Sequence, residues 1–128
     1  MILAKCRFEV LRLTEEDPKV MPLDVELIND SIDAASGMEL GTSTRRDIDR
    51  AIYRIVGHLR LVMAEELGAD EDSGVMELFK QGYRLLELST RPTPSTPVFG
   101  AFNYLRDATN LTRRLMAVYT ERHGAGVT

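Results

Sequence analysis

Cationic and titratable side chains repeat at every fourth position in one stretch of the sequence. The repeat consists of Arg46, Arg50, Arg54 and His58, and Arg45 precedes it. Residues four apart lie on one side of a helix, so these side chains form a single ridge. Guanidinium groups suit phosphate or carboxylate because their donors form a planar fork. The pattern is therefore compatible with an anion-binding strip, or with a DNA-binding regulator that uses residues 42–54 like the start of a recognition helix.

Ion pairing between neighbouring helices is a second explanation of this ridge. Glu26, Asp30 and Asp33 form an acidic ridge on the preceding predicted helix. Antiparallel helices joined by a short loop would place the two ridges near each other, and each exposed pair would contribute about 0–1 kcal/mol. The net charge of −4 also gives no general attraction to nucleic acid. We therefore predict a ladder of salt bridges, and nucleic acid is disfavoured as a partner.

Residues suited to metal binding or catalysis are sparse and scattered. The single cysteine, Cys6, and the two histidines, His58 and His123, are far apart in the sequence and lack the Glu-x-x-His spacing of di-iron bundles. The chain contains no Gly-x-Ser-x-Gly elbow, P-loop or Gly-x-Gly-x-x-Gly motif. We therefore predict that the protein is not an enzyme and takes no metal or cofactor. A pocket for a small apolar ligand, with His58, Tyr53 or Tyr83 as polar contacts, is an open alternative.

The helix that carries the arginines has two apolar sides. One side is expected to face the core through Ile48, Ile52, Ile55, Leu59 and Val62. The other consists of Tyr53, Gly57, Leu61 and Ala64. A helix that is apolar all round must be buried on more than one side, and a glycine inside it costs about 1 kcal/mol in helix propensity. We therefore predict that this second side forms a homodimer interface or binds another protein, and Gly82 suggests a similar close approach elsewhere.

The positions of the prolines predict the elements that carry these residues. All five prolines lie within residues 18–22 and 92–97, and the stretches between and after these two clusters show helical periodicity. We predict one helix from an Asp24 N-cap to Gly37, and a second over 45–67, capped by Thr42, Ser43 or Thr44 and ended by Gly68. A third begins near Ser73, and the fourth spans 100–123. The expected fold is all-α, an antiparallel four-helix bundle with an additional N-terminal segment.

The inward sides of the last two helices follow from the same periodicity. For the third helix we expect Val75, Leu78, Phe79, Gly82, Tyr83, Leu85 and Leu86 to face inward. For the fourth we expect Ala101, Tyr104, Leu105, Ala108, Leu111, Leu115, Val118 and Tyr119. The proline-rich stretch between the two helices is expected to be a stiff, extended connector.

The chain length of 128 residues indicates one domain. We divide it into an N-terminal segment and loop over 1–22, a bundle over 23–123 and a flexible tail over 124–128. Residues 1–13 are compatible with either a short helix or a strand. The sequence has no apolar run of about 18 residues for a membrane span, and its start does not resemble a signal peptide. With one cysteine, these features predict a cytoplasmic protein.

Three stretches carry a resemblance to known proteins. They are IDAASGM, IDRAIYRIVGHLRLVMAEEL and ATNLTRRLMAVYTERHG. They resemble small all-helical actinobacterial proteins of unknown function that are associated with natural-product biosynthesis. The resemblance covers roughly residues 24–124 and supplies no catalytic motif, so no residue role follows from it. It implies a small, cytoplasmic accessory protein that is not itself a catalyst.

Overall fold

A computed structural model describes residues 23–127, with side chains described up to His123. This part of the chain is all-α and contains no strand, which confirms the predicted fold class. Its elements are α1 (Val25–Ser36), α2 (Arg45–Met63), α3 (Ser73–Leu86), the short 3₁₀ helix η3 (Leu88–Thr90) and α4 (Val98–Val127). The predicted helix or strand over residues 1–13 lies outside the described residues.

Helix α1 begins and ends at the predicted residues. The Asp24 carboxylate accepts a hydrogen bond from the Leu27 backbone N–H at 3.0 Å, which satisfies one of the donors left free at a helix start. Gly37 follows the last turn, and its N–H donates to the Asp33 carbonyl at 3.0 Å. Ile28, Ile32 and other residues at helical spacing are buried, so α1 packs through one side.

Helix α2 begins with a capping box at Thr44. The Thr44 hydroxyl accepts from the Asp47 N–H at 3.1 Å, and the Asp47 carboxylate accepts from the Thr44 N–H at 3.3 Å. All five predicted core residues of this helix are buried. The predicted end at Gly68 is wrong, because Ala64 already caps the helix. Gly68 instead turns the loop with a φ of 83°, a conformation that favours glycine.

The second half of the chain departs from the predictions in three places. Tyr83 is 59% exposed, because its position on α3 points away from the side formed by Val75, Leu78 and Phe79. The connector contains the 3₁₀ helix and a turn in which the Thr96 N–H donates to the Thr93 carbonyl, so it is not simply extended. Helix α4 begins two residues before the predicted Gly100 and ends at Val127, four residues beyond the predicted end at residue 123.

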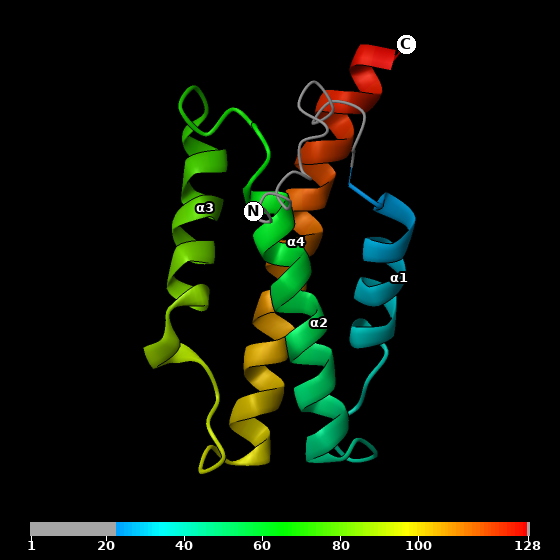
Figure 1. Ribbon diagram of the computed structural model, residues 1–128, viewed down its shortest axis with the longest axis vertical. Helices are drawn as coiled ribbons and strands as arrows, with labels where there is room; N and C mark the ends of the chain where they lie inside the picture. Colours follow the sequence, from blue (N-terminus) through cyan, green and yellow to red (C-terminus); the bar gives the residue numbers. More distant parts are fainter. Residues whose placement is uncertain (1–22, 128) are drawn as a thin grey trace, which may run out of the picture.

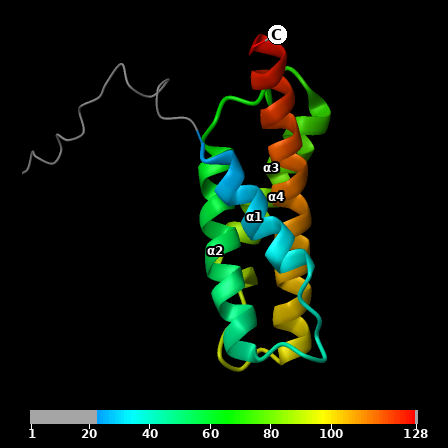
Figure 2. The same cartoon turned by 90° about the vertical axis from the view of Figure 1, so that its right-hand side faces the viewer.

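The helices run alternately up and down, and the pair α2 and α4 forms the centre (Figure 1). These two helices run parallel, and each contacts all three other α-helices. Helices α1 and α3 flank the pair on opposite sides (Figures 1 and 2). The core between them is aliphatic and includes Ile28, Ile48, Ile55, Leu59, Leu105 and Leu115. Burying each such side chain contributes about 1.5–3 kcal/mol.

Two tyrosines of α4 form hydrogen bonds with the segments that flank it. The Tyr104 hydroxyl donates to the Leu85 carbonyl near the end of α3. The Tyr119 hydroxyl accepts from the Leu23 N–H at 3.4 Å, just before α1. Among the helices of the described part, none is both long enough and apolar enough to cross a membrane.

Candidate interaction surface on helix α2

On the side of α2 opposite the core, an apolar strip lies among the exposed Arg46, Arg50, Arg54 and Arg60, and no other described residue covers it. It consists of Tyr53, Gly57, Leu61 and Ala64, which we call the outer face of α2. Tyr53 is 85% exposed and Leu61 is 55% exposed, while Gly57 is half-buried and Ala64 is exposed. In Figure 2, no other described helix lies beyond this side of α2. The predicted second apolar side therefore exists on the surface.

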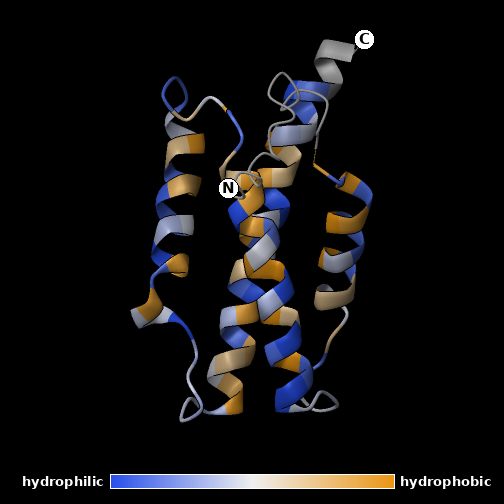
Figure 3. Ribbon diagram, viewed as in Figure 1, coloured by the Kyte–Doolittle hydropathy of each residue, from blue (hydrophilic) through white to orange (hydrophobic). Residues whose placement is uncertain are grey.

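The outer sides of the two central helices, α2 and α4, can be compared directly. The exposed residues of α4 are mostly polar or charged, and they include Arg106, Asp107, Asn110 and Arg114. The exposed residues of α2 are also mostly charged, and they include Arg46, Arg50, Arg54 and Arg60, with Tyr53 and Leu61 exposed among them. The hydropathy along both helices can be followed in Figure 3. Large contiguous apolar patches mark contact sites, whereas single exposed apolar side chains are ordinary.

Gly57 has no packing explanation within the described chain. A Cβ built on Gly57 would meet no atom within 4 Å, so the helix has room for a larger residue there. A Cβ on Gly82 would instead clash with the end of the Met63 side chain. The predicted close backbone approach at Gly82 is therefore wrong, because a side chain of the same protein fills that space. Among the helical glycines within residues 23–123, Gly57 is the one with no described atom beside it to offset the cost of glycine in a helix.

The predicted salt-bridge ladder does not form. Within residues 23–123 the only ion pair joins Arg45 and Asp49. Glu26, Asp30 and Asp33 are exposed, and they lie about half a turn around α1 from its buried residues. The α1 residues that border Arg50 and Arg54 are Ser31, Ala34 and Ala35, which carry no charge. Arg46, Arg50 and Arg54 are exposed and have no carboxylate partner among the described residues.

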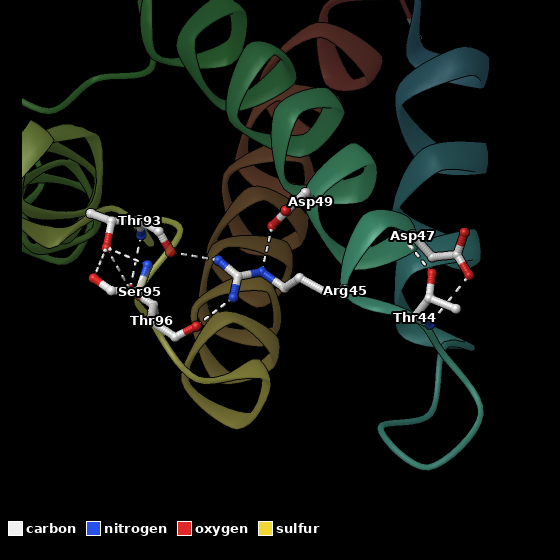
Figure 4. Close-up of polar contacts among 7 residues, drawn as sticks. All are labelled: Thr44, Arg45, Asp47, Asp49, Thr93, Ser95 and Thr96. Carbon is white, nitrogen blue, oxygen red and sulfur yellow. Dashed lines mark hydrogen bonds and ion pairs between the residues drawn. The ribbon is translucent and has the colours of Figure 1, made fainter.

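The guanidinium of Arg45 forms hydrogen bonds within the protein and is not free to bind a ligand (Figure 4). Its Nε donates to the Asp49 carboxylate at 2.9 Å, and its two Nη atoms donate to the carbonyls of Thr93 and Thr96. These bonds hold the connector between η3 and α4 against the start of α2. Sequence reasoning missed this role because the acceptors are backbone atoms about fifty residues away.

His58 lies between the outer face of α2 and helix α1. Its Nε2 is 3.0 Å from the Ser31 hydroxyl, a buried polar group that the sequence did not single out. Partial burial lowers the pKa of His58 from its ordinary value, and nearby Arg54 lowers it further, whereas Asp24 opposes these effects. No three potential metal ligands cluster within the described residues.

Of the three residues suggested for an apolar-ligand pocket, Tyr53 and His58 line one open hollow along α2, whereas Tyr83 lies on α3. Tyr53 and Tyr83 are exposed on different helices, and only His58 is half-buried. A groove beside the outer face, between α2 and the connector, is lined by Asp49, Ile52, Tyr53, Val56, Gly57, Arg60, Arg91 and Pro92. The outer face and this groove form one continuous surface through Tyr53 and Gly57.

Comparison with known proteins finds no matching family, no matching curated protein and no matching solved structure.

Proposed function

We propose that this protein is a non-enzymatic helical interaction protein that self-associates through the outer face of α2. The observation that carries this proposal is the combination of exposed Tyr53 and Leu61 with the internally unexplained Gly57. A glycine allows a second helix to approach closely, and the flanking aromatic and aliphatic side chains supply apolar area.

Removal of apolar surface from water would drive the association. Each Å² of buried apolar surface contributes about 25 cal/mol, before the cost of bringing two molecules together is subtracted. A tyrosine suits such a site because its ring buries apolar area while its hydroxyl can stay wet. A symmetric dimer would bury the same patch on both copies, so one apolar face is sufficient for association.

The accessory role rests on the sequence. The chain contains none of the catalytic motifs discussed above, and its resemblance to small actinobacterial proteins links it to natural-product biosynthesis. A reducing cytoplasm suits its single cysteine. The proposed partner at the outer face of α2 is a second copy of the chain. The alternative is another protein with a complementary apolar helix.

Light scattering of the full chain tests the proposal. We expect a dimer at micromolar concentration and a monomer for Leu61→Arg, because a charge would be buried at the centre of the contact. Ala117→Arg is the matched control, since Ala117 is exposed on α4 and its substitution should leave the dimer intact. A wild-type chain that is strictly monomeric and unchanged by Leu61→Arg would exclude self-association through this face.

DNA binding by the region 42–54 is a second candidate, favoured by one observation. Arg46 and Arg50 are exposed without carboxylate partners in the described structure, so their charge is available to phosphate. Affinity for duplex DNA should then fall steeply with salt and drop further in Arg46→Ala and Arg50→Ala. Absence of binding at low salt would remove this candidate.

A further inference from the structure

Four arginines surround the apolar residues of the outer face of α2. They are exposed, and none has a carboxylate partner within the described residues; they are Arg46, Arg50, Arg54 and Arg60. Arg54 and Arg60 lie three residues to either side of Gly57, so at about 100° per residue they project about 60° to its two sides. Arg46 and Arg50 continue the face toward the start of the helix. Guanidinium groups therefore border the apolar strip on both sides.

The carboxylates of α2 do not compensate this charge. The helix contains two of them, Asp47 and Asp49. The Asp47 carboxylate accepts from the Thr44 N–H in the capping box, and the Asp49 carboxylate lies 2.9 Å from the Nε of Arg45. The uncompensated charge on the outer face is thus positive, although the whole chain has a net charge of −4. A partner that complements this face must bring negative charge.

The apolar part of the strip has the dimensions of a contact between helices. Tyr53 and Leu61 lie four residues to either side of Gly57, so the three residues extend over about 12 Å, or about two helical turns. Tyr53 and Gly57 line two hollows along the strip, one of which includes Arg54 and the other Arg60. A Cβ on Gly57 would meet no atom within 4 Å, so another backbone has room to approach the middle of the strip.

We propose that the outer face of α2 binds an acidic amphipathic helix of another protein. This inference rests on the proposed role of the face as a contact surface, and it adds an occupant other than a second copy. The apolar side of the partner helix packs on Tyr53, Gly57 and Leu61. Carboxylates that border this apolar side pair with Arg54 and Arg60. Coiled coils divide the work in the same way, with an apolar seam between charged flanking positions.

The same arginines weaken self-association through this face. Two copies that meet there bring arginines toward arginines in either relative direction, because α2 offers no uncompensated carboxylate in return. Like charges across an interface disfavour association, whereas an acidic helix replaces this repulsion by attraction. Added salt should therefore strengthen the homodimer and weaken the complex with an acidic helix, since it screens both interactions.

Binding of labelled synthetic peptides to the full chain tests the proposal. The probe is a helical peptide with leucines along one side and glutamates along both borders of that side. Its counterpart carries lysine in place of every glutamate. Fluorescence anisotropy should show binding of the glutamate peptide, with an affinity that falls about tenfold between about 0.01 M and 0.15 M salt, and no binding of the lysine peptide. Equal binding of the two peptides would overturn the proposal.

A charge reversal at the borders of the strip locates the contact. R54E/R60E should bind the glutamate peptide about tenfold more weakly than wild type and should bind the lysine peptide instead. R84E/R114E is the matched control, because it changes the net charge equally at exposed positions on α3 and α4. The control should bind the glutamate peptide as wild type does. An equal loss in both variants would overturn the proposed site, because the total charge alone would then explain binding.

Other outcomes assign the face differently. A polyglutamate peptide without leucine, or duplex DNA, that binds as tightly as the glutamate–leucine peptide would indicate a general site for polyanions and overturn the helix as occupant. A monomeric wild-type chain that binds the glutamate–leucine peptide would overturn self-association and support this inference. A homodimer that excess peptide neither binds nor dissociates would overturn this inference and leave self-association standing.

Discussion

Gly57 and Gly82 both lie inside helices, yet their surroundings differ completely. Gly82 on α3 is buried, and Met63 and Leu111 side chains occupy the space beside it. Gly57 on α2 faces open space on the side of the helix that also exposes Tyr53 and Leu61. Contacts among the described residues therefore explain the first glycine and not the second.

This difference separates two kinds of small residue that look alike in a sequence. A glycine that admits a neighbouring side chain stabilises the fold despite its poor helix propensity. A glycine with nothing beside it weakens its own helix by about 1 kcal/mol relative to alanine. Substitutions at the two positions should therefore change stability in opposite directions.

The largest effect is expected at Gly82. Gly82→Leu should lower the free energy of unfolding by about 1–3 kcal/mol, because the new side chain must displace Met63 from a packed contact. Chemical denaturation monitored by circular dichroism measures this change. Gly57→Leu is the matched control and should raise the free energy of unfolding at concentrations where the chain is monomeric. Equal losses at both positions would break the distinction between the two glycines.

At Gly57 we expect smaller effects, a gain in stability and a loss of self-association. Gly57→Ala should stabilise the dilute chain by up to about 1 kcal/mol through helix propensity. It should at the same time weaken the proposed self-association, because a methyl group at this position would keep a second helix from approaching α2 closely. Denaturation at low concentration and sedimentation equilibrium at high concentration measure the two effects. Ala117→Gly on α4 is the control, and it should reduce stability without changing association.

The smallest effect concerns the pH dependence contributed by His58. Burial and Arg54 lower the pKa of this imidazole in the folded chain, so the unfolded chain binds the proton more readily below pH 6.5. The stability contributed by neutral His58 is fully present above that value and is lost as pH falls through the folded pKa. Wild type should therefore lose more stability than His58→Gln between pH 7.5 and pH 5 in thermal unfolding. Identical pH profiles would contradict this role.

Local periodicity was sufficient to predict the fold. The caps at Asp24 and Thr44 and the spacing of Ile48, Ile52 and Ile55 are local signals, and the structure confirms them. The end of α2 was misplaced because Gly68 is a strong stop signal, whereas the helix already ends at Ala64 without a special residue. The sequence analysis predicted that Tyr83 is buried because it is an aromatic residue next to a core position. Its angular position around the helix axis, which decides its exposure, was not considered.

The sequence predicted the surface contacts only in part, and the errors in that prediction have one cause. The apolar outer face of α2 follows from spacing within one helix, and the structure exposes those residues. The ladder from Arg50 and Arg54 to α1 depended on how α1 is rotated about its own axis, which spacing in α2 does not reveal. The bonds of Arg45 to the carbonyls of Thr93 and Thr96 depended on the path of a distant connector. Contacts between elements require the relative orientation of those elements.

A tryptophan placed at position 53 tests the central claim most directly, because the chain contains no native tryptophan. The indole of Tyr53→Trp would report only the polarity around the outer face of α2. We predict that its emission moves to shorter wavelength as the protein concentration rises into the micromolar range, while Tyr83→Trp on α3 shows no such shift. An emission maximum that stays at the wavelength of water-exposed indole at every concentration would contradict self-association through this face.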